Sequence, residues 1–329
     1  MKIAVDAMGG DNSPKNNIEG AVLALKDPAI EILLVGIPEE MEPFLSKFNF
    51  DSSRLSIVPS EGAILDTEQP GLAVKRRPNS SINVCSGLVK NGIAEGFISP
   101  GNSGATFASA AGVLGMFEGL SKPCVGAAVF GFSPKTLILD LGLNVDPSSK
   151  QLIDFAALGV SQAKILYGIE NPTVGLLSNG SESNKGNKLI KESFELFDKS
   201  SLNFLGNIEG HDIATGKVNV IVCDGFTGNI LLKAIEGMGD VIFKYLSKEI
   251  TDIKYEKIIR KISDNTNLMR EFGGGPIFGV NGIAVIAHGA SSPIAISNGI
   301  NTVSWYSKKD YVNRLRQELK EIRRSINSD

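Results

Sequence analysis

The sequence predicts an α/β protein with a mostly parallel β-sheet and helices on both of its faces, which is a three-layer arrangement. The first observation is that short apolar strand segments alternate with helical segments along the chain. The second is that six of the strands end in loops rich in Gly, Asn, Ser or Asp. Parallel neighbours would bring these loops to one edge of the sheet, where open α/β sheets place their ligands. We therefore expect one polar cleft, in a single domain over residues 1–329 that no repeat or low-complexity linker interrupts.

Each predicted strand is a short apolar run that is followed by a loop. In chain order the runs are Lys2–Val5, Glu31–Val35, Leu55–Val58, Phe97–Ser99, Thr136–Asp140, Thr173–Leu177, Val220–Cys223 and Ile283–Ala287. Helical patterns start at Asn12–Pro14, span Ser81–Lys90 and Ala105–Leu114, start near Lys188, span Ile230–Leu246, follow Ser292 and start again at Asp310. Gly273–Pro276 is expected to form a sharp loop. The last helix is amphipathic, with an apolar stripe of Val312, Leu315, Leu319, Ile322 and Ile326.

The stretch Val220–Tyr245 combines a buried strand, a glycine loop and a helix. Asp224 stands at the carboxyl end of the strand, and Gly225 and Gly228 let a ligand approach the backbone closely. Free N–H groups at the start of the helix favour an anion. The stretch therefore indicates an anion site, with an ordinary strand–turn–helix connection as the alternative.

Composition excludes several classes of protein. Hydrophobic residues make up 42% of the chain, which is enough for a large core, and 33 basic against 36 acidic residues argue against a general nucleic-acid binder. Cys85, Cys124 and Cys223 have no CxxC spacing, so we interpret them as reduced thiols of a cytosolic protein and favour a buried, unreactive Cys223 over a nucleophile. We expect neither a signal peptide nor an apolar run of the ~20 residues needed to span a bilayer.

Motifs of the common chemistries are absent. The sequence has no dinucleotide fingerprint, no Walker A loop, no GxSxG elbow and no HExxH. With only His211 and His288 in the chain, neither a histidine-built metal site nor a Ser–His–Asp triad is favoured. What remains is a set of glycine amides, Asn and Ser side chains and one lysine, which suits phosphate binding and oxyanion stabilisation without a covalent nucleophile. We expect no metal and no cofactor.

Taken together the motifs resemble the PlsX family, the acyl-ACP:phosphate acyltransferases of bacterial phospholipid synthesis, over nearly the whole chain. The segments that carry the resemblance are Ile3–Asp11, Ser99–Ala105, Asp140–Asp146, Asn184–Asn187, Gly206–Ile213, Val222–Ile230, Gly273–Pro276 and Ala287–Ser291. IAVDAMGGD and VCDGFTGNI are the most specific. The chain departs from the family pattern at Pro100, Ser103 and Leu143, and His211 stands where Arg is common.

The resemblance implies that orthophosphate attacks the thioester of a long-chain acyl group on acyl carrier protein, which yields acyl phosphate and the free carrier. It also implies a homodimer, a Rossmann-like fold related to phosphotransacetylases and isocitrate-type dehydrogenases, and no metal. We expect a cytoplasmic protein in loose contact with the membrane, where a glycerol-3-phosphate acyltransferase would use the product.

Site roles follow from what this chemistry needs. Phosphate is already nucleophilic, so the protein has to position it and stabilise charge on the carbonyl oxygen. We assign Lys185 to hold phosphate or the oxyanion, Asn229 to donate a hydrogen bond there, and Asp224 to orient Lys185 or a backbone amide. The amides of residues 225–229, including Gly225, Thr227 and Gly228, would cradle the anion. The rest of the cleft is assigned to Asp6, Gly9, Gly10, Asn102, Ser103, Gly104 and His288.

Alternatives stay open at several positions. Lys185 could be an ordinary exposed loop lysine, Asn102 and Asn229 could be helix caps, and His288 could be a structural histidine. The Lys75–Arg77 cluster is either a solvated face or a contact for an acidic partner. A phosphotransacylase acting on acyl-coenzyme A is the nearest rival function, followed by an isocitrate-type dehydrogenase and a non-enzymatic scaffold at the membrane.

The region of residues 230–265 is expected to be helical and to face a dimer partner or the membrane. Its helix supplies candidates for the wall of an acyl slot, and basic residues follow at Lys244, Lys248, Lys254, Lys257, Arg260 and Lys261. These charges suit a membrane surface or an acidic carrier protein. An ordinary solvated helix face is the alternative, because Glu249, Asp252 and Glu256 are interspersed.

Overall fold

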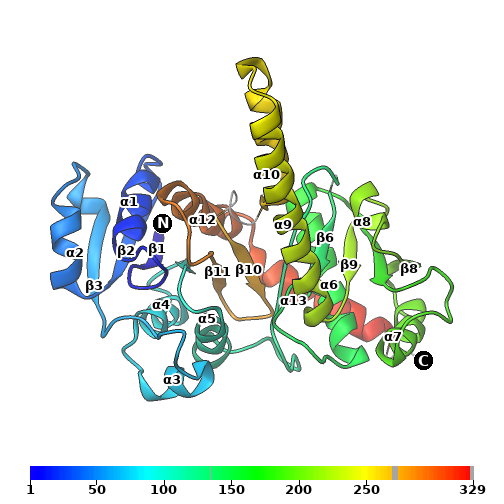
Figure 1. Ribbon diagram of the computed structural model, residues 1–329. Coiled ribbons are helices and arrows are strands. Elements are labelled where there is room, and N and C mark those ends of the chain that lie inside the picture. The colour runs from blue at the N-terminus through cyan, green and yellow to red at the C-terminus, as the bar shows by residue number, and fades with distance from the viewer. Residues whose placement is uncertain (134, 269–272, 327–329) are drawn as a thin grey trace. The chain divides into compact units, whose positions relative to one another are not determined.

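A computed structural model describes residues 1–133, 135–268 and 273–326 of the chain. The chain forms two compact units (Figure 1). The first unit comprises Met1–Gly119 with Met269–Val312, and the second comprises Leu120–Leu268 with Asn313–Asp329. The prediction of a single domain over residues 1–329 stays a prediction.

The first unit is built on strands in the order β3-β2-β1-β4-β11-β10. Their bounds are β1 Lys2–Asp6, β2 Glu31–Gly36, β3 Leu55–Pro59, β4 Gly96–Ser99, β10 Gly275–Phe278 and β11 Ile283–Ile286. All neighbouring pairs are parallel except β10 with β11. The carboxyl ends of β1, β4 and β11 therefore lie at one edge of this sheet.

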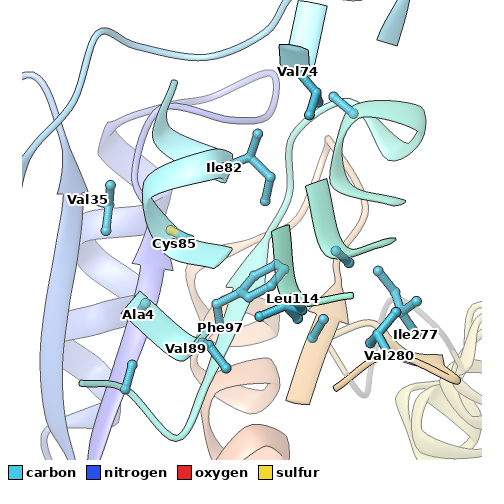
Figure 2. Packing of buried hydrophobic residues seen from close by; sticks show 14 of the residues in the cluster. Ala4, Val35, Val74, Ile82, Cys85, Val89, Phe97, Leu114, Ile277 and Val280 are labelled. Carbon is cyan, nitrogen blue, oxygen red and sulfur yellow. The ribbon is translucent and has the colours of Figure 1, made fainter. Parts of the chain in front are cut away.

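Helices cover both faces of the first sheet (Figure 1). α1 (Lys15–Ala24) and α12 (Pro293–Ser307) pack against each other on one face, and α4 (Ser81–Lys90) and α5 (Ser103–Ser109) lie on the other. The remaining helical segments are α2 Pro38–Leu45, η1 Ser52–Arg54, α3 Pro70–Arg76 and the π-helical turn η2 Ala110–Leu114. Figure 2 shows the core beneath α4, where Ile82, Cys85 and Val89 pack over Ala4 and Phe97.

The second unit has strands in the order β5-β6-β9-β7-β8. Their bounds are β5 Cys124–Ala127, β6 Leu137–Leu139, β7 Thr173–Leu177, β8 Asn203–Ile208 and β9 Val220–Val222. Among the described strands of this unit, β5 pairs antiparallel with β6, and the pairs β6–β9, β9–β7 and β7–β8 are parallel. The helices are α6 Ser149–Tyr167, α7 Lys188–Lys199, α8 Asp212–Thr215, α9 Gly225–Glu249, η3 Ile253–Tyr255, α10 Glu256–Thr266 and α13 Tyr311–Ile326. The far half of α9 and the adjacent α10 extend away from the strands of this unit (Figure 1).

The predicted fold class is confirmed, and so are the positions of the eight predicted strands. The amphipathic C-terminal helix is also confirmed, because Leu315, Leu319 and Ile322 are buried. All three cysteines are free and buried, and burial raises the pKa of the Cys223 thiol well above its ordinary value, as expected for an unreactive thiol.

Several elements differ from the prediction. Gly275 and Pro276 belong to strand β10 and not to a loop, because they pair with Ile286 and Val285 of β11. α9 begins at Gly225 and not at Ile230, because Asp224 caps it. Sequence patterns did not predict α6, although Ser148 and Gln151 form a capping box at its start. Most of the α6 surface is buried, so the helix lacks the polar face that would have marked it as amphipathic.

Candidate functional site

Three loops at the carboxyl ends of β1, β4 and β11 meet in the first unit. Ser99 Oγ donates to Asp6 Oδ2 at 2.6 Å, which joins the loop after β1 to the end of β4. Asp11 N donates to Gly289 O at 2.9 Å, which joins the same loop to the one after β11. The parallel order of the strands thus brings together residues that are far apart in the sequence.

The loop after β1 is held from beneath by buried polar groups. Asp6 Oδ1 accepts from the amides of Met8 at 3.1 Å and Gly9 at 3.2 Å. Asn17, which is 3% exposed, directs Nδ2 at the carbonyl oxygens of Asp6, Ala7 and Gly9 at 2.8–3.2 Å. Asp6 is itself only 1% exposed, so its carboxylate supports the loop from the interior of the unit.

Gly9 and Gly10 are required by the close approach of these loops. A Cβ on Gly9 would lie 2.5 Å from Gly101 Cα, which is backbone and has no room to move aside. Gly10 has a φ of +92°, a conformation that residues with a side chain rarely adopt. Larger residues at either position would separate the loop after β1 from the loop after β4.

A polar cavity of about 300 Å³ lies above these loops in the first unit. Gly9, Gly10, Asn102 and Ser103 are among the residues that line it, and the segment Ala63–Asp66 forms a further wall. Gly104 lies in the first turn of α5, where an added Cβ would be 2.7 Å from Pro70 Cγ.

Asn102 is a helix cap, and His288 makes a hydrogen bond within its own loop. Asn102 is the N-cap of α5, because its Oδ1 accepts from Ala105 N at 2.8 Å. His288 is exposed, and its Nδ1 accepts from Ala290 N at 3.1 Å within its own loop. These two bonds involve neither Asn102 Nδ2 nor His288 Nε2, so both nitrogens still have an N–H or a lone pair for a ligand.

In the second unit the start of α9 packs against the loop Asp140–Asp146. Gly225 N donates to Asn144 O at 2.7 Å, and a Cβ on Gly228 would collide with the backbone carbonyl of Asp140. Asp140 is buried and accepts from Asn144 N at 2.6 Å and from Val125 N at 3.1 Å. Burial raises the pKa of the Asp140 carboxyl, and hydrogen bonds from Val125 and Asn144 oppose that rise. The sequence motif at 140–146 does not by itself indicate this supporting role.

The predicted cradle of amides at residues 225–229 is wrong in large part. Thr227 N donates to Asp224 Oδ1 at 2.8 Å, and Gly228 N donates to Asp224 O at 3.0 Å. With Gly225 N bound to Asn144, three of these amides already have partners inside the chain. The physical reason is the earlier start of α9, which turns the expected loop into a capped first turn.

Asp224 orients a backbone amide, one of the two roles left open for it. Its Oδ1 binds Thr227 N, and its Oδ2 accepts from Thr227 Oγ1 at 2.8 Å. Asn229 is not a helix cap, since Asp224 has that position, and it lies within the first turns of α9. Its side chain faces Gly142, where an added Cβ would be 2.7 Å from Asn229 Nδ2.

Lys185 lies on the exposed loop between β7 and α7. Its amide donates to Glu182 O at 3.0 Å, and Gly186 N donates to Asn179 Oδ1 at 2.9 Å, which gives the loop a defined shape. Across the described ranges, no hydrogen-bond or ion-pair partner is recorded for Lys185 Nζ. His211 is 73% exposed, and its Nε2 is 3.6 Å from Asp212 Oδ1.

Because the carboxyl of Asp6 is buried, we predict that the free energy of unfolding depends on pH. Burial raises the pKa of its carboxyl above the ordinary 3.8, although hydrogen bonds from Ser99, Met8 and Gly9 limit the rise. The folded state therefore binds a proton more tightly than the unfolded state, and its stability falls as pH rises from 3.8 through the folded-state pKa. We expect wild type to lose stability relative to Asp6→Asn over that window, as measured by urea unfolding at a series of pH values.

Asp212 provides a contrast to Asp6, because the stability that it contributes changes with pH in the opposite direction. Hydrogen bonding from Glu209 N and the nearby Lys217 ammonium lower the pKa of its carboxyl below 3.8. The stability that Asp212 contributes is present above 3.8 and is lost as pH falls through the folded-state pKa. A pH-independent difference between wild type and Asp6→Asn would contradict the assignment for Asp6.

Comparison with known proteins places the chain in a family. A sequence profile described as "Fatty acid synthesis protein" matches residues 1–314. A protein named phosphate acyltransferase from Geobacter sulfurreducens is 39% identical over 326 residues, which cover 97% of this chain and 94% of that protein. A phosphate acyltransferase from Clostridioides difficile is 37% identical over 326 residues, which cover 96% of each chain.

Solved structures support the same fold. A phosphotransacetylase from Streptococcus pyogenes superposes with a TM-score of 0.63 at 18% identity, over 97% of this chain and 94% of that one. A branched-chain phosphotransacylase from Enterococcus faecalis gives a TM-score of 0.58 at 14% identity, over 94% and 99%. At these identities the likeness concerns the fold, whereas the full-length relatives establish the family. The chain belongs to the PlsX family of phosphate acyltransferases, a family of acyltransferase enzymes.

Proposed function

We propose that this enzyme transfers a long-chain fatty acyl group from acyl carrier protein to orthophosphate. A phosphate oxygen attacks the thioester carbonyl carbon, the carbon–sulfur bond breaks, and the carrier thiolate leaves and takes up a proton. The product is an acyl phosphate, which a glycerol-3-phosphate acyltransferase would consume in phospholipid synthesis. No metal or other cofactor is proposed to take part.

The observation that carries this proposal is the exposed side chain of Lys185 on a shaped loop at the carboxyl end of β7. An exposed lysine with no recorded partner across the described ranges is available to an anion, and the bonds at Lys185 N and Gly186 N hold its backbone. A point charge there stabilises phosphate or the oxyanion that develops on the carbonyl. Asn229 is proposed to donate a hydrogen bond to the same centre. The polar cavity lined by Gly9, Gly10 and Asn102 is proposed to hold substrate groups.

The test is phosphate-dependent loss of the thioester from palmitoyl-ACP, with palmitoyl-coenzyme A in parallel. We expect rapid turnover of the carrier substrate with formation of acyl phosphate. Turnover with coenzyme A alone would make the protein a phosphotransacylase, which is the alternative function. Turnover of neither donor would contradict the proposal.

We further propose that residues 230–265 mediate homodimer formation and contact with the membrane, for a cytoplasmic protein that associates peripherally. One face of α9 exposes large apolar side chains at helical spacing, which are Phe226 59%, Ile230 52%, Met238 64%, Val241 67% and Tyr245 62% exposed. Beyond α9, Ile253 is 83% and Ile258 is 63% exposed, next to Lys254, Lys257 and Lys261. None of the helices in the described ranges has the length and apolarity to cross a bilayer.

Two measurements separate these roles. Val241→Glu should convert the dimer to a monomer in sedimentation velocity, because a charge on the apolar face opposes its burial. Ile253→Glu should weaken sedimentation with vesicles of phosphatidylglycerol and phosphatidylcholine while the dimer persists. A monomeric wild-type protein would contradict the proposed dimer. A wild-type protein that does not sediment with these vesicles would contradict the proposed membrane contact.

A further inference from the structure

Asn102 is held from both ends of its side chain in the first unit. Its Oδ1 accepts from Ala105 N at 2.8 Å, and its Nδ2 donates to Asp66 Oδ1 at 2.6 Å. The side-chain amide of Asn has two N–H donors on Nδ2, and Asp66 takes one of them. Among the residues that the structure describes, no partner is recorded for the second N–H, and Asn102 lines the cavity of about 300 Å³.

Asp66 is itself held by a loop with anchors on both sides. Ile64 is 4% exposed and belongs to the hydrophobic core of the unit. Arg77 Nη1 donates to Ala63 O at 2.8 Å and to Glu68 Oε2 at 2.9 Å. Arg77 thus closes the loop between β3 and α3, and it places the Asp66 carboxylate opposite Asn102.

We propose that Asp66 is a positioning residue that orients the Asn102 amide for phosphate binding. The bond between them is short because its acceptor is a carboxylate, and together with the cap bond at Asn102 Oδ1 it fixes the orientation of the amide at the cavity wall. Asp66 also lines the cavity, but it acts through Asn102, because a carboxylate and a phosphate repel each other. This inference rests on the proposed function and adds a residue to it.

The first experiment compares Asp66→Ala with Asp66→Asn in the phosphate-dependent reaction of palmitoyl-ACP. Asp66→Ala should raise the KM for phosphate about tenfold, since a hydrogen bond to a charged group is lost. The KM for palmitoyl-ACP and kcat should stay within about twofold, because the lost contact serves phosphate binding alone. Asp66→Asn keeps an oxygen acceptor for Asn102 Nδ2 and should restore the phosphate KM to within about threefold of wild type.

Glu61→Ala is the matched control. Glu61 is exposed on the same loop and also accepts from an asparagine, with Asn79 Nδ2 at 3.0 Å from Glu61 Oε1, but it does not line the cavity. It should leave both KM values unchanged. A wild-type phosphate KM in Asp66→Ala, or an equal loss in Asp66→Asn and Glu61→Ala, would overturn the proposal.

A second readout does not depend on turnover. The side-chain amide of Asn102 is followed by ¹⁵N–¹H NMR and is assigned by its loss in Asn102→Asp. In Asp66→Ala its resonances should shift, because Asn102 Nδ2 loses its carboxylate acceptor, and inorganic phosphate should shift them in wild type. If wild type turns over no acyl carrier substrate, the proposed function fails while this measurement still tests Asp66. Resonances that are the same in wild type and Asp66→Ala would refute the positioning role.

Discussion

Lys185→Ala should lower turnover of the acyl carrier substrate by about 10²–10³-fold, the range seen when one oxyanion donor is removed. The side chain is exposed, so the free energy of unfolding should change by no more than about 0.5 kcal/mol. Kinetics with palmitoyl-ACP and phosphate, together with urea unfolding, measure both effects. A folded variant with full turnover would remove Lys185 from the mechanism.

Lys188→Ala is the control for charge alone. Lys188 follows three residues later, its side chain is 90% exposed, and its ammonium pairs with Glu192 at 3.7 Å. Because it lies in the first turn of α7 with its charge already paired, its removal should change turnover by less than about twofold. Equal losses in the two variants would indicate a general electrostatic effect in place of a specific contact.

Gly228→Ala should be the most disruptive small substitution at the start of α9. The added methyl would collide with the carbonyl oxygen of Asp140, which is backbone of the loop beneath. We expect a loss of about 3 kcal/mol in the free energy of unfolding, the upper part of the usual range for overpacking. Turnover should fall as well, because the displaced turn carries Asp224 and Asn229.

The same helix offers a control for the glycine-to-alanine change. Gly237 lies in the interior of α9, and an added Cβ would meet no described atom within 4 Å beyond its chain neighbours and the adjacent backbone of its own helix. Gly237→Ala should therefore stabilise the protein by about 0.5–1 kcal/mol through its helix propensity. If Gly228→Ala were equally stabilising, the close contact with Asp140 would not constrain the fold.

Local patterns in the sequence were sufficient to predict much of the fold. α4 has the predicted bounds Ser81–Lys90, and β7 has the predicted bounds Thr173–Leu177. Both follow from patterns of apolar residues within a few positions of each other, which is the range over which helical or strand spacing acts. The order of motifs along the chain likewise led to the family that the full-length relatives establish.

Features that depend on distant partners were decided by the tertiary structure. The first turn of α9 was predicted as an open loop, because nothing local shows that Asn144 O would accept from Gly225 N. Ser148 and Gln151 mark the start of α6. Because most of that helix is buried, its sequence lacks the alternation of apolar and polar faces that would reveal helical spacing.

The same holds for the polar contacts of the candidate site. Ser99 and Asp6 are 93 positions apart, and Asn102 and Asp66 are 36 apart. The order of parallel strands determines which loop ends meet, and hydrogen bonds form only between groups that this order brings within reach. The sequence by itself therefore determined the fold class, the family and the residue types of the site, whereas the tertiary structure decided which of those residues hold each other and which remain available to a ligand.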